Sequence, residues 1–412
     1  MTAPDPVAAA ESRNPFASPR FLPWWLASLV AGTGVGIQSV TVPLFIRDRV
    51  GVDERAIAIA AALIAHSLPG ALLTLFGGAL ADRVERGRIL ARTYGTVAVV
   101  SVAYVFLSGF DVRLIWPVFV LGAIVGSSTA FTNPARQSML PQLVSPAQLQ
   151  NGVILGTMGF MATLQFLGPT VAGLLAEASG LTLAFALEVV MLSAAAVLFS
   201  RVPTDLPEPS GRSVAADLLE GLHYIRARPE LLWLLVMATL PGVFFMGSFS
   251  VTVPIVVPDI LHAGDKWVGI LWGCFGGGVF VSSILLTLFR LRRRGLAICL
   301  SMVAGGLILT AYGLSETLSI STVLLFVWGA GAAVFINYVV ALLQENTEPR
   351  MMGRVMSMYS LAFFISAPVG YLQAGIVTSV FGPKATLLSS GVVSGLLGVA
   401  FLVLLKPVRD LK

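Results

Sequence analysis

The chain has 412 residues, of which 56% are hydrophobic and 11% are charged. Because soluble domains carry roughly 25% charged residues, this composition excludes an ordinary soluble protein and indicates a protein embedded in a membrane. The net charge of +5 does not indicate a nucleic-acid partner, because most basic residues lie in short loops between apolar runs. The two cysteines and three histidines form no cluster in the sequence, so we expect neither a metal site nor a cofactor.

The first 20 residues are polar and rich in proline, and we expect residues 1–20 to form a disordered tail. A membrane-spanning helix needs about 20 mostly apolar residues, and twelve such runs follow the tail. The first run is too long for the apolar part of a cleaved signal peptide. The predicted spans are 21–46, 56–80, 89–109, 114–134, 149–177, 182–200, 230–257, 267–289, 296–314, 319–343, 354–380 and 385–405.

The basic residues gather in alternate loops, which indicates the orientation of the chain. With the N-terminus in the cytoplasm, most Arg and Lys residues fall in internal segments. The external segments then hold Arg47, Arg49, Arg55, Arg113, Lys266 and Lys384. An even number of spans places both termini in the cytoplasm.

The loop between the second and third runs concentrates charge in a chain that has little of it. Two glycines, Gly77 and Gly78, precede this loop and allow neighbouring helices to approach closely. The charged residues of the loop are Asp82, Arg83, Glu85, Arg86 and Arg88.

The longest internal loop, 201–229, divides the spans into two sets of six. Its leucine and isoleucine residues recur with helical spacing, which predicts an amphipathic helix at the inner membrane surface. The chain therefore divides into an N-terminal bundle (21–200), this linker, a C-terminal bundle (230–405) and a short tail (406–412).

The two bundles repeat one another in sequence. The segment Ser39–Pro43 recurs as Ser250–Pro254, each near the end of the first run of its bundle. Gly180 after the fifth run corresponds to Gly382 after the eleventh. Parallel repeats of this kind are one of the known plans for transporters.

On these features the chain resembles the major facilitator superfamily, and in particular its enterobactin-type siderophore exporters and macrolide efflux pumps. Gly78, Asp82, Arg83, Arg86 and Arg88 match that family's signature between its second and third helices, and Glu85 is an acid usual in this subgroup. The subgroup's other stretches are matched by residues 133–137, 140–144, 220–225, 353–357 and 367–370. The resemblance covers essentially the whole chain. It implies an all-α fold of twelve transmembrane helices in two pseudo-symmetric six-helix bundles, placed in a bacterial plasma membrane.

The resemblance also implies a conformational latch in the charged loop. In the family, the acid corresponding to Asp82 accepts hydrogen bonds from the first amides of helix eleven, here around Gly353. The loop's arginine often pairs with an acid at the end of helix four, where this chain offers Arg136 and no acid. A solvated, positively charged loop is the alternative interpretation.

The fifth span carries Gly168, Pro169 and Gly173, a partial form of the family's antiporter signature, with Ala172 where a glycine is usual. Proline removes one backbone hydrogen bond and glycine permits close packing, so this segment can bend. The resemblance implies an exporter, and a kink without a coupling role is the alternative.

Two titratable residues inside the spans are candidates for proton coupling. Glu188 is the acid placed well inside a span, where a charge costs at least about 2.5 kcal/mol. His66 lies midway along the second span. Each also has a structural interpretation, Glu188 as a carboxyl bonded near the outer interface and His66 as a packing donor.

Five further residues are candidates for the substrate cavity, because polar amides and aromatic rings inside spans either bind substrate or join helices. They are Gln38, Gln165, Phe245, Asn337 and Gln373. Together these features predict a monomeric carrier that uses the proton gradient to export an amphipathic small molecule through the lipid bilayer. A lysophospholipid transporter, a polytopic enzyme and a channel are the alternatives.

Overall fold

The computed structural model describes residues 14–81, 84–110, 115–202, 214–289, 292–409 and 411, and the side chains of all of these except 74–81 and 214–218. In these residues the protein is helical and contains no strand. Twelve helices or pairs of helices are long and apolar enough to cross a membrane, as predicted. Helices prevail because a bilayer offers no water to satisfy backbone N–H and C=O groups.

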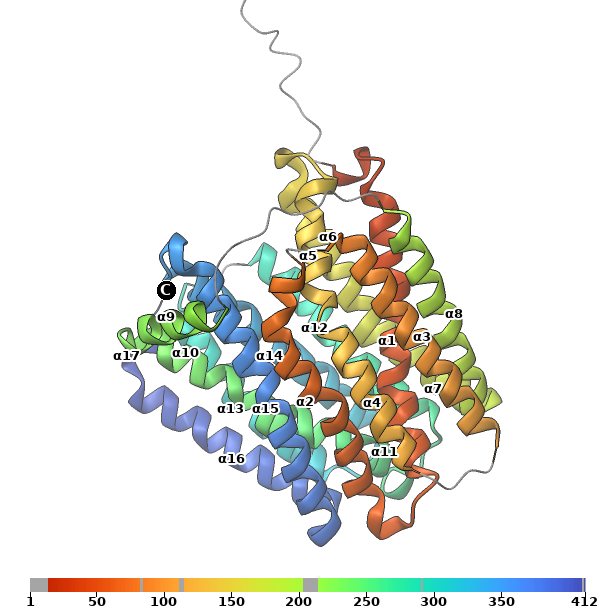
Figure 1. Cartoon of the computed structure of the whole chain (residues 1–412). Helices are drawn as coiled ribbons and strands as arrows, with labels where there is room; N and C mark the ends of the chain where they lie inside the picture. Colours follow the sequence, from red (N-terminus) through yellow and green to blue (C-terminus); the bar gives the residue numbers. More distant parts are fainter. Residues whose placement is uncertain are drawn as a thin grey trace, which may run out of the picture.

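The N-terminal half contains six spans, two of which are built from a pair of helices (Figure 1). Its helices are α1 (Phe21–Arg47), α2 (Arg55–Ala81), α3 (Arg86–Gly109), α4 (Trp116–Thr129) with α5 (Thr132–Leu143), α6 (Pro146–Ala162) with α7 (Gly168–Ser179), and α8 (Leu181–Ser200).

The linker helix α9 (Val214–Arg226) leads into the C-terminal half, which repeats the six-span plan. Its helices are α10 (Pro229–Leu240) with α11 (Gly247–Asp259), α12 (Lys266–Leu288), α13 (Arg294–Leu314), α14 (Leu318–Glu345), α15 (Met352–Phe381), α16 (Pro383–Leu404) and the short α17 (Lys406–Arg409). Short 3₁₀ turns lie at Pro15–Ala17, Val52–Glu54 and Pro349–Met351.

Two spans contain a π-helical turn next to a proline. One turn, Thr163–Leu167, joins α6 to α7 and directly precedes Gly168 and Pro169. The other, Pro241–Met246, joins α10 to α11. Proline has no N–H to donate, so the regular hydrogen-bond ladder is interrupted at both places. The fifth and eleventh spans, predicted at 149–177 and 354–380, extend over 34 and 33 residues in the structure.

The sequence match between Gly180 and Gly382 has a structural counterpart. Both glycines end their helices with a left-handed backbone, at φ values of 82° and 86°. Glycine adopts this conformation without the steric cost that other residues meet. The two halves therefore repeat a local turn as well as an order of spans.

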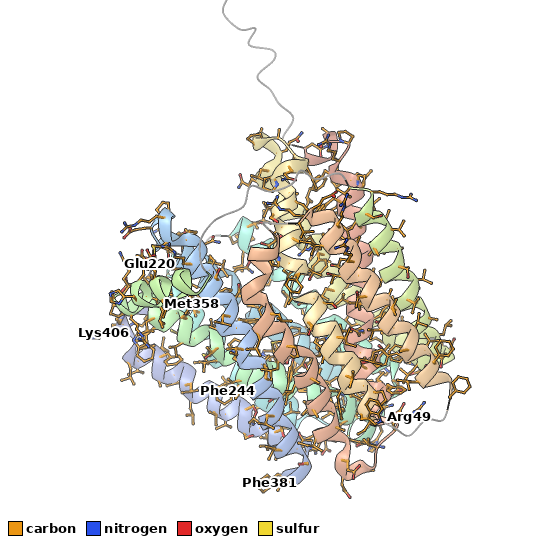
Figure 2. The ribbon with its side chains drawn as sticks, in the orientation of Figure 1. Arg49, Glu220, Phe244, Met358, Phe381 and Lys406 are labelled. Atoms are coloured by element: carbon orange, nitrogen blue, oxygen red, sulfur yellow. The ribbon has the colours of Figure 1, made fainter. Side chains whose placement is uncertain are left out.

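We call the end of the molecule where α1 begins and α16 ends the terminal end, and the opposite end, where α1 and α15 end, the distal end. In Figure 2, Glu220 and Lys406 lie toward the terminal end, whereas Arg49 and Phe381 lie at the distal end. A buried apolar cluster joins α1 and α7 of one half to α11, α12 and α14 of the other. Its members include Ile37, Val40, Ala172, Val256 and Leu325.

Candidate functional site

The carboxyl group of Glu188 lies at the meeting point of three helices of the N-terminal half. Its side chain on α8 is fully buried. The Nε2 of Gln38 on α1 donates to Glu188 Oε1 over 2.8 Å, and the Oγ of Ser101 on α3 donates to the same oxygen over 2.5 Å. The second carboxyl oxygen, Oε2, is buried and has no hydrogen-bond partner.

Packing of α8 against α1 and α3 brings these groups together. Tyr104 and Phe185 stack with their ring centroids 5.1 Å apart, which encloses this region in aromatic surface. Burial of an ionised carboxylate is costly unless it is hydrogen-bonded. The site therefore provides two donors for one oxygen and none for the other.

The other predicted substrate amides lie in separate environments. Gln165 lies in the first π turn, and its Nε2 is 3.6 Å from Met161 Sδ. Asn337 donates to the carbonyl of Ala333 over 2.8 Å and to Ser283 Oγ over 3.2 Å.

In the C-terminal half, Gln373 Nε2 is 3.5 Å from Ser390 Oγ, while Gln373 Oε1 is buried without a partner. Phe245 lies in the second π turn, Pro241–Met246, beside aromatic rings of α11, α12 and α14, and its ring centroid lies 5.5 Å from that of Trp328. The structure thus brings Gln38 to Glu188, and the described contacts do not join the five predicted substrate residues to one another.

His66 lies where α2 crosses α4. A Cβ built on Gly126 of α4 would overlap the carbonyl oxygen of His66, so glycine permits this crossing. The two candidate titratable groups, Glu188 and His66, therefore belong to different helix contacts.

The predicted antiporter segment forms contacts within and between the halves. A Cβ on Gly168 would lie 2.7 Å from the Cα of Gly36 on α1, and one on Gly173 would lie 2.8 Å from the Cα of Gly269 on α12. Such distances are shorter than real Cβ contacts, so these glycines allow backbones to touch. Gly173 and Gly269 belong to different halves, and their contact lies toward the distal end.

The predicted latch is described in part. Asp82 and Arg83 lie outside the described residues, as does the surrounding of Gly78. Arg86 Nη1 donates to the carbonyl of Ser138 on α5 over 2.8 Å. The loop's arginine thus reaches the end of the fourth span through a backbone carbonyl, in a chain that has no acid there.

Arg88 pairs with Glu85 within the loop, at 2.6 Å. A Cβ on Gly353 would meet no described atom within 4 Å. The described contacts of the loop therefore remain within the N-terminal half.

The linker helix α9 packs against the start of α15. Arg354 pairs with Glu220 at 2.6 Å, and Ile225 is fully buried in the core of the C-terminal half. Arg228 pairs with Glu348 at 2.7 Å and stacks on Tyr224, 3.8 Å from the ring centroid. The sequence predicted a helix on the membrane surface but not its contacts with the C-terminal half. The residues that it contacts are more than a hundred positions away in the sequence.

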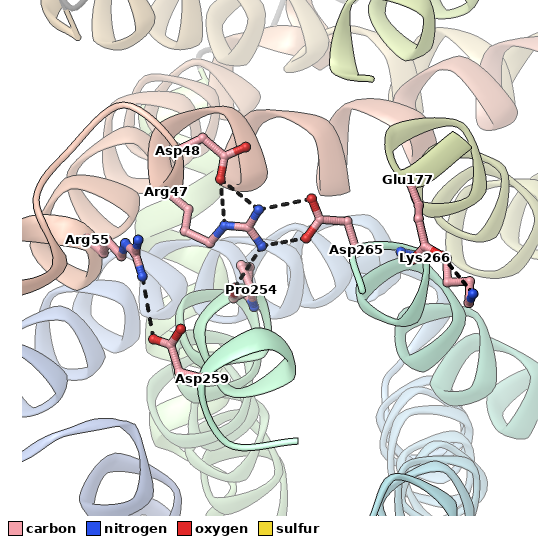
Figure 3. A network of polar contacts seen from close by, with 8 residues as sticks. All are labelled: Arg47, Asp48, Arg55, Glu177, Pro254, Asp259, Asp265 and Lys266. Atoms are coloured by element: carbon pink, nitrogen blue, oxygen red, sulfur yellow. Dashed lines mark hydrogen bonds and ion pairs between the residues drawn. The ribbon is translucent and has the colours of Figure 1, made fainter. Parts of the chain in front are cut away.

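Among the described residues, three ion pairs join the two halves at the distal end (Figure 3). Arg47 at the end of α1 meets Asp265 before α12 with both ends of its guanidinium, at 2.7 and 3.0 Å. Arg55 of α2 lies 3.5 Å from Asp259 of α11.

The third pair joins Lys266 of α12 to Glu177 of α7 at 2.7 Å. From the sequence, Arg47, Arg55 and Lys266 are assigned only to external segments, and no partner is predicted for them. Their acidic partners could have been suggested by their position at the ends of spans, but the pairing depends on how the halves meet.

Two bundles of six spans, joined by a linker and in contact at one end, define a membrane transporter of the two-half type. The chain belongs to the Major Facilitator Superfamily, whose sequence profile matches residues 24–371 and 290–412.

Curated relatives are similar over nearly the full length. Macrolide efflux protein A of Streptococcus pyogenes is 24% identical, with 90% of this chain and 92% of the relative covered. The multidrug efflux pump Tap of Mycobacterium tuberculosis is 25% identical, covering 92% and 91%. The enterobactin exporter EntS of Escherichia coli is 23% identical, covering 95% and 93%.

Solved structures share the fold at lower identity. A peptide transporter, POT, in complex with sulfate superposes with a TM-score of 0.73 at 13% identity, covering 96% of both chains. The nucleoside transporter NupG gives a TM-score of 0.69 at 15% identity, covering 94% of this chain and 99% of its own. These likenesses confirm the predicted all-α fold. Membership of the Major Facilitator Superfamily confirms the prediction that the protein is a transporter.

Proposed function

We propose that the protein exports an amphipathic small molecule, such as a drug or a siderophore, in exchange for protons. The observation that carries this proposal is the buried Glu188 carboxyl, which receives Gln38 and Ser101 on one oxygen and has its other oxygen unpartnered. In the part of the chain that the structure describes, no cation pairs with this carboxyl. A proton is then the charge that neutralises it when it is shielded from water.

The direction of transport is supported by the relatives, which are named as efflux proteins or exporters. The partial antiporter segment at Gly168 and Pro169 agrees with that direction. The apolar spans, with few charges, suit an amphipathic substrate better than a strongly ionic one, which would need fixed cations in the cavity.

The proposed cycle is alternating access, in which the halves rock about a substrate bound between them. We place the protein in a bacterial plasma membrane with both termini in the cytoplasm, so that the distal end faces outward. The structure then corresponds to the conformation closed to the outside. The protein is proposed to act as a monomer, with no cofactor other than the proton gradient.

Replacing Glu188 with Gln tests the proposal. In proteoliposomes with an imposed pH gradient, the wild-type protein should expel a macrolide or ethidium at a rate that depends on pH. Glu188→Gln should flatten that dependence and lower the rate by about tenfold or more, corresponding to about 1.4 kcal/mol in the barrier. An unchanged pH profile in this variant would exclude Glu188 as the proton carrier.

Glu316 supplies a matched acid-to-amide control outside the spans. Its hydrogen bond and charge interaction with Lys384 lower the pKa of Glu316 below its usual value. A lowered pKa stabilises the fold above the usual pKa, and that contribution is lost only as the pH falls through the lowered value. Glu316 therefore stays ionised in the neutral range, and Glu316→Gln should leave the pH profile of efflux unchanged.

A further inference from the structure

Arg47 lies between two acids that belong to different halves of the molecule. Its side chain is 8% exposed, although a guanidinium stays charged in a protein. Asp265 of the C-terminal half receives Nη1 and Nη2 at 2.7 and 3.0 Å. Asp48, the next residue in the chain, receives Nε at 2.8 Å and Nη2 at 2.7 Å (Figure 3). The carbonyl of Pro254 accepts a further, longer bond from Nη1 at 3.4 Å.

The internal repeat shows which of these charged residues have a counterpart in the other half. The offset that aligns Ser39–Pro43 with Ser250–Pro254 also aligns Asp48 with Asp259, and Arg55 with Lys266. Arg55 and Lys266 both pair across the halves, and both pairs are partly exposed. Arg47 aligns with Pro258, so the buried arginine has no counterpart in the other half. The repeat therefore relates the basic residues of two ion pairs, although Lys266 pairs with Glu177 and not with Asp48, the counterpart of Asp259. The Arg47 pair has no counterpart in the other half.

Opening of the distal end must separate Arg47 from Asp265 and Pro254, because these belong to the half that moves away. Loss of its partner is strongly destabilising for a charge that stays buried. Asp48 adjoins Arg47 at the end of α1 and moves with it. Its side chain is 43% exposed, so it remains accessible to the arginine when the interface opens.

We propose that Asp48 is a positioning residue that holds Arg47 after the distal end opens, while Asp265 holds it when the distal end is closed. Arg47 thus binds both Asp48 and Asp265 in the closed conformation and Asp48 alone in the open one. The exchange lowers the cost of breaking the distal contact in each cycle. This inference rests on the alternating-access cycle proposed above.

The two acids are then expected to have opposite effects, which gives a direct test. In the closed conformation Arg47 keeps Asp265 when Asp48 is changed, whereas in the open conformation it has no acid left. Asp48→Asn should therefore reduce the open population and slow efflux. Asp265→Asn removes the partner made only on closing and should increase the open population. We expect shifts of at least about fivefold in opposite directions.

The measurement is a pulsed electron paramagnetic resonance distance between spin labels in the full chain, reconstituted in nanodiscs. Labels at Val52→Cys and Leu314→Cys lie on different halves at the distal end, where these side chains are 68% and 65% exposed. Cys274 and Cys299 are first replaced with Ala. Asp48→Glu, which keeps the carboxylate, should restore the wild-type distribution. Asp53→Asn, at an acid outside the three ion pairs, provides the control.

Two results would overturn the inference. One is a shift in the same direction for Asp48→Asn and Asp265→Asn, which would mean that Asp48 favours the closed conformation, as Asp265 does. The other is a distance distribution in Asp48→Asn that equals that of the wild-type protein when ethidium or erythromycin is present. If the wild-type protein itself shows a single distance under all conditions and expels neither compound, the proposed function fails and the inference fails with it.

Discussion

Gln38 shows how a residue's neighbours change its interpretation. In the sequence it is one of several amides inside spans and a candidate for substrate binding. In the structure its Nε2 is bonded to Glu188, and the side chain is 7% exposed. An amide fixed on a buried carboxyl acts through that carboxyl, whatever substrate is bound.

Replacement of Gln38 with Leu distinguishes these two roles. Hydrogen bonds to charged groups contribute about 1.5–3 kcal/mol, so loss of this donor makes the ionised form of Glu188 less stable. The pH profile of efflux should then change equally for chemically different substrates. A substrate-binding role would instead change the KM for some substrates and leave the pH profile alone.

Ser101→Ala is the matched variant, because Ser101 donates to the same oxygen from another helix. A similar change in the pH profile for both variants would support a common action on Glu188. Glu188 itself could be predicted from sequence, since an acid inside an apolar span is rare and costly. The partners of Glu188 could not be predicted, because Gln38 and Ser101 lie on other spans. A single sequence does not show which spans pack together.

At the scale of helices, the glycines of the fifth span determine how closely the halves approach. Gly168 fits against α1 within its own half, and Gly173 fits against Gly269 of α12 in the other half. The sequence predicted a special role for this segment from Gly168 and Pro169. It did not predict that Gly173 touches the other half, which requires the relative position of α7 and α12.

Gly173→Ala should disfavour the distal-closed conformation. The added Cβ would lie 2.8 Å from backbone atoms of Gly269 and from the carbonyl of Lys266, which cannot rotate away. Overpacking typically costs about 1–3 kcal/mol, and this cost falls on the closed form alone. Efflux should therefore fall about tenfold, and labels at the distal end should report more of the open form.

A control is available in α14, where a Cβ on Gly331 meets no described atom within 4 Å. Gly331→Ala should leave the distance distribution and efflux unchanged. If Gly173→Ala behaves in the same way as this control, the close approach of α7 and α12 does not limit the cycle.

At the scale of the whole molecule, sequence separation determines what could be predicted. The loop signature around Asp82 lies within a dozen residues, so its resemblance is readable from the sequence. The distal pair of Arg47 and Asp265 joins residues 218 positions apart. Twelve spans, their order and the internal repeat follow from apolar runs and repeated segments, and these features are confirmed. The contacts between the halves could not be predicted in this way, because each one joins side chains from both halves. Only the structure shows them.

The distal contacts and the proposed latch would then act at opposite ends of the molecule and in opposite conformations. The structure has the distal ion pairs formed, and no described atom lies within 4 Å of a Cβ at Gly353. A carboxylate that binds the start of α15 would stabilise the other conformation, in which the terminal end is closed. Interaction of an acid with a helix N-terminus contributes roughly 0.3–2 kcal/mol, which is enough to balance two conformations of similar energy.

Asp82→Asn should therefore move the population toward the distal-closed form and lower efflux by about tenfold, with expression unchanged. The same distal spin labels measure the population, and proteoliposome efflux measures the rate. Asp53→Asn, an acid-to-amide change at an exposed distal turn, is the control. Normal efflux by Asp82→Asn would mean that the charged loop serves to orient the chain in the membrane and does not act as a latch. Combining Asp82→Asn with Asp265→Asn sharpens the test, because loss of one contact at each end should return the distance distribution toward that of the wild-type protein.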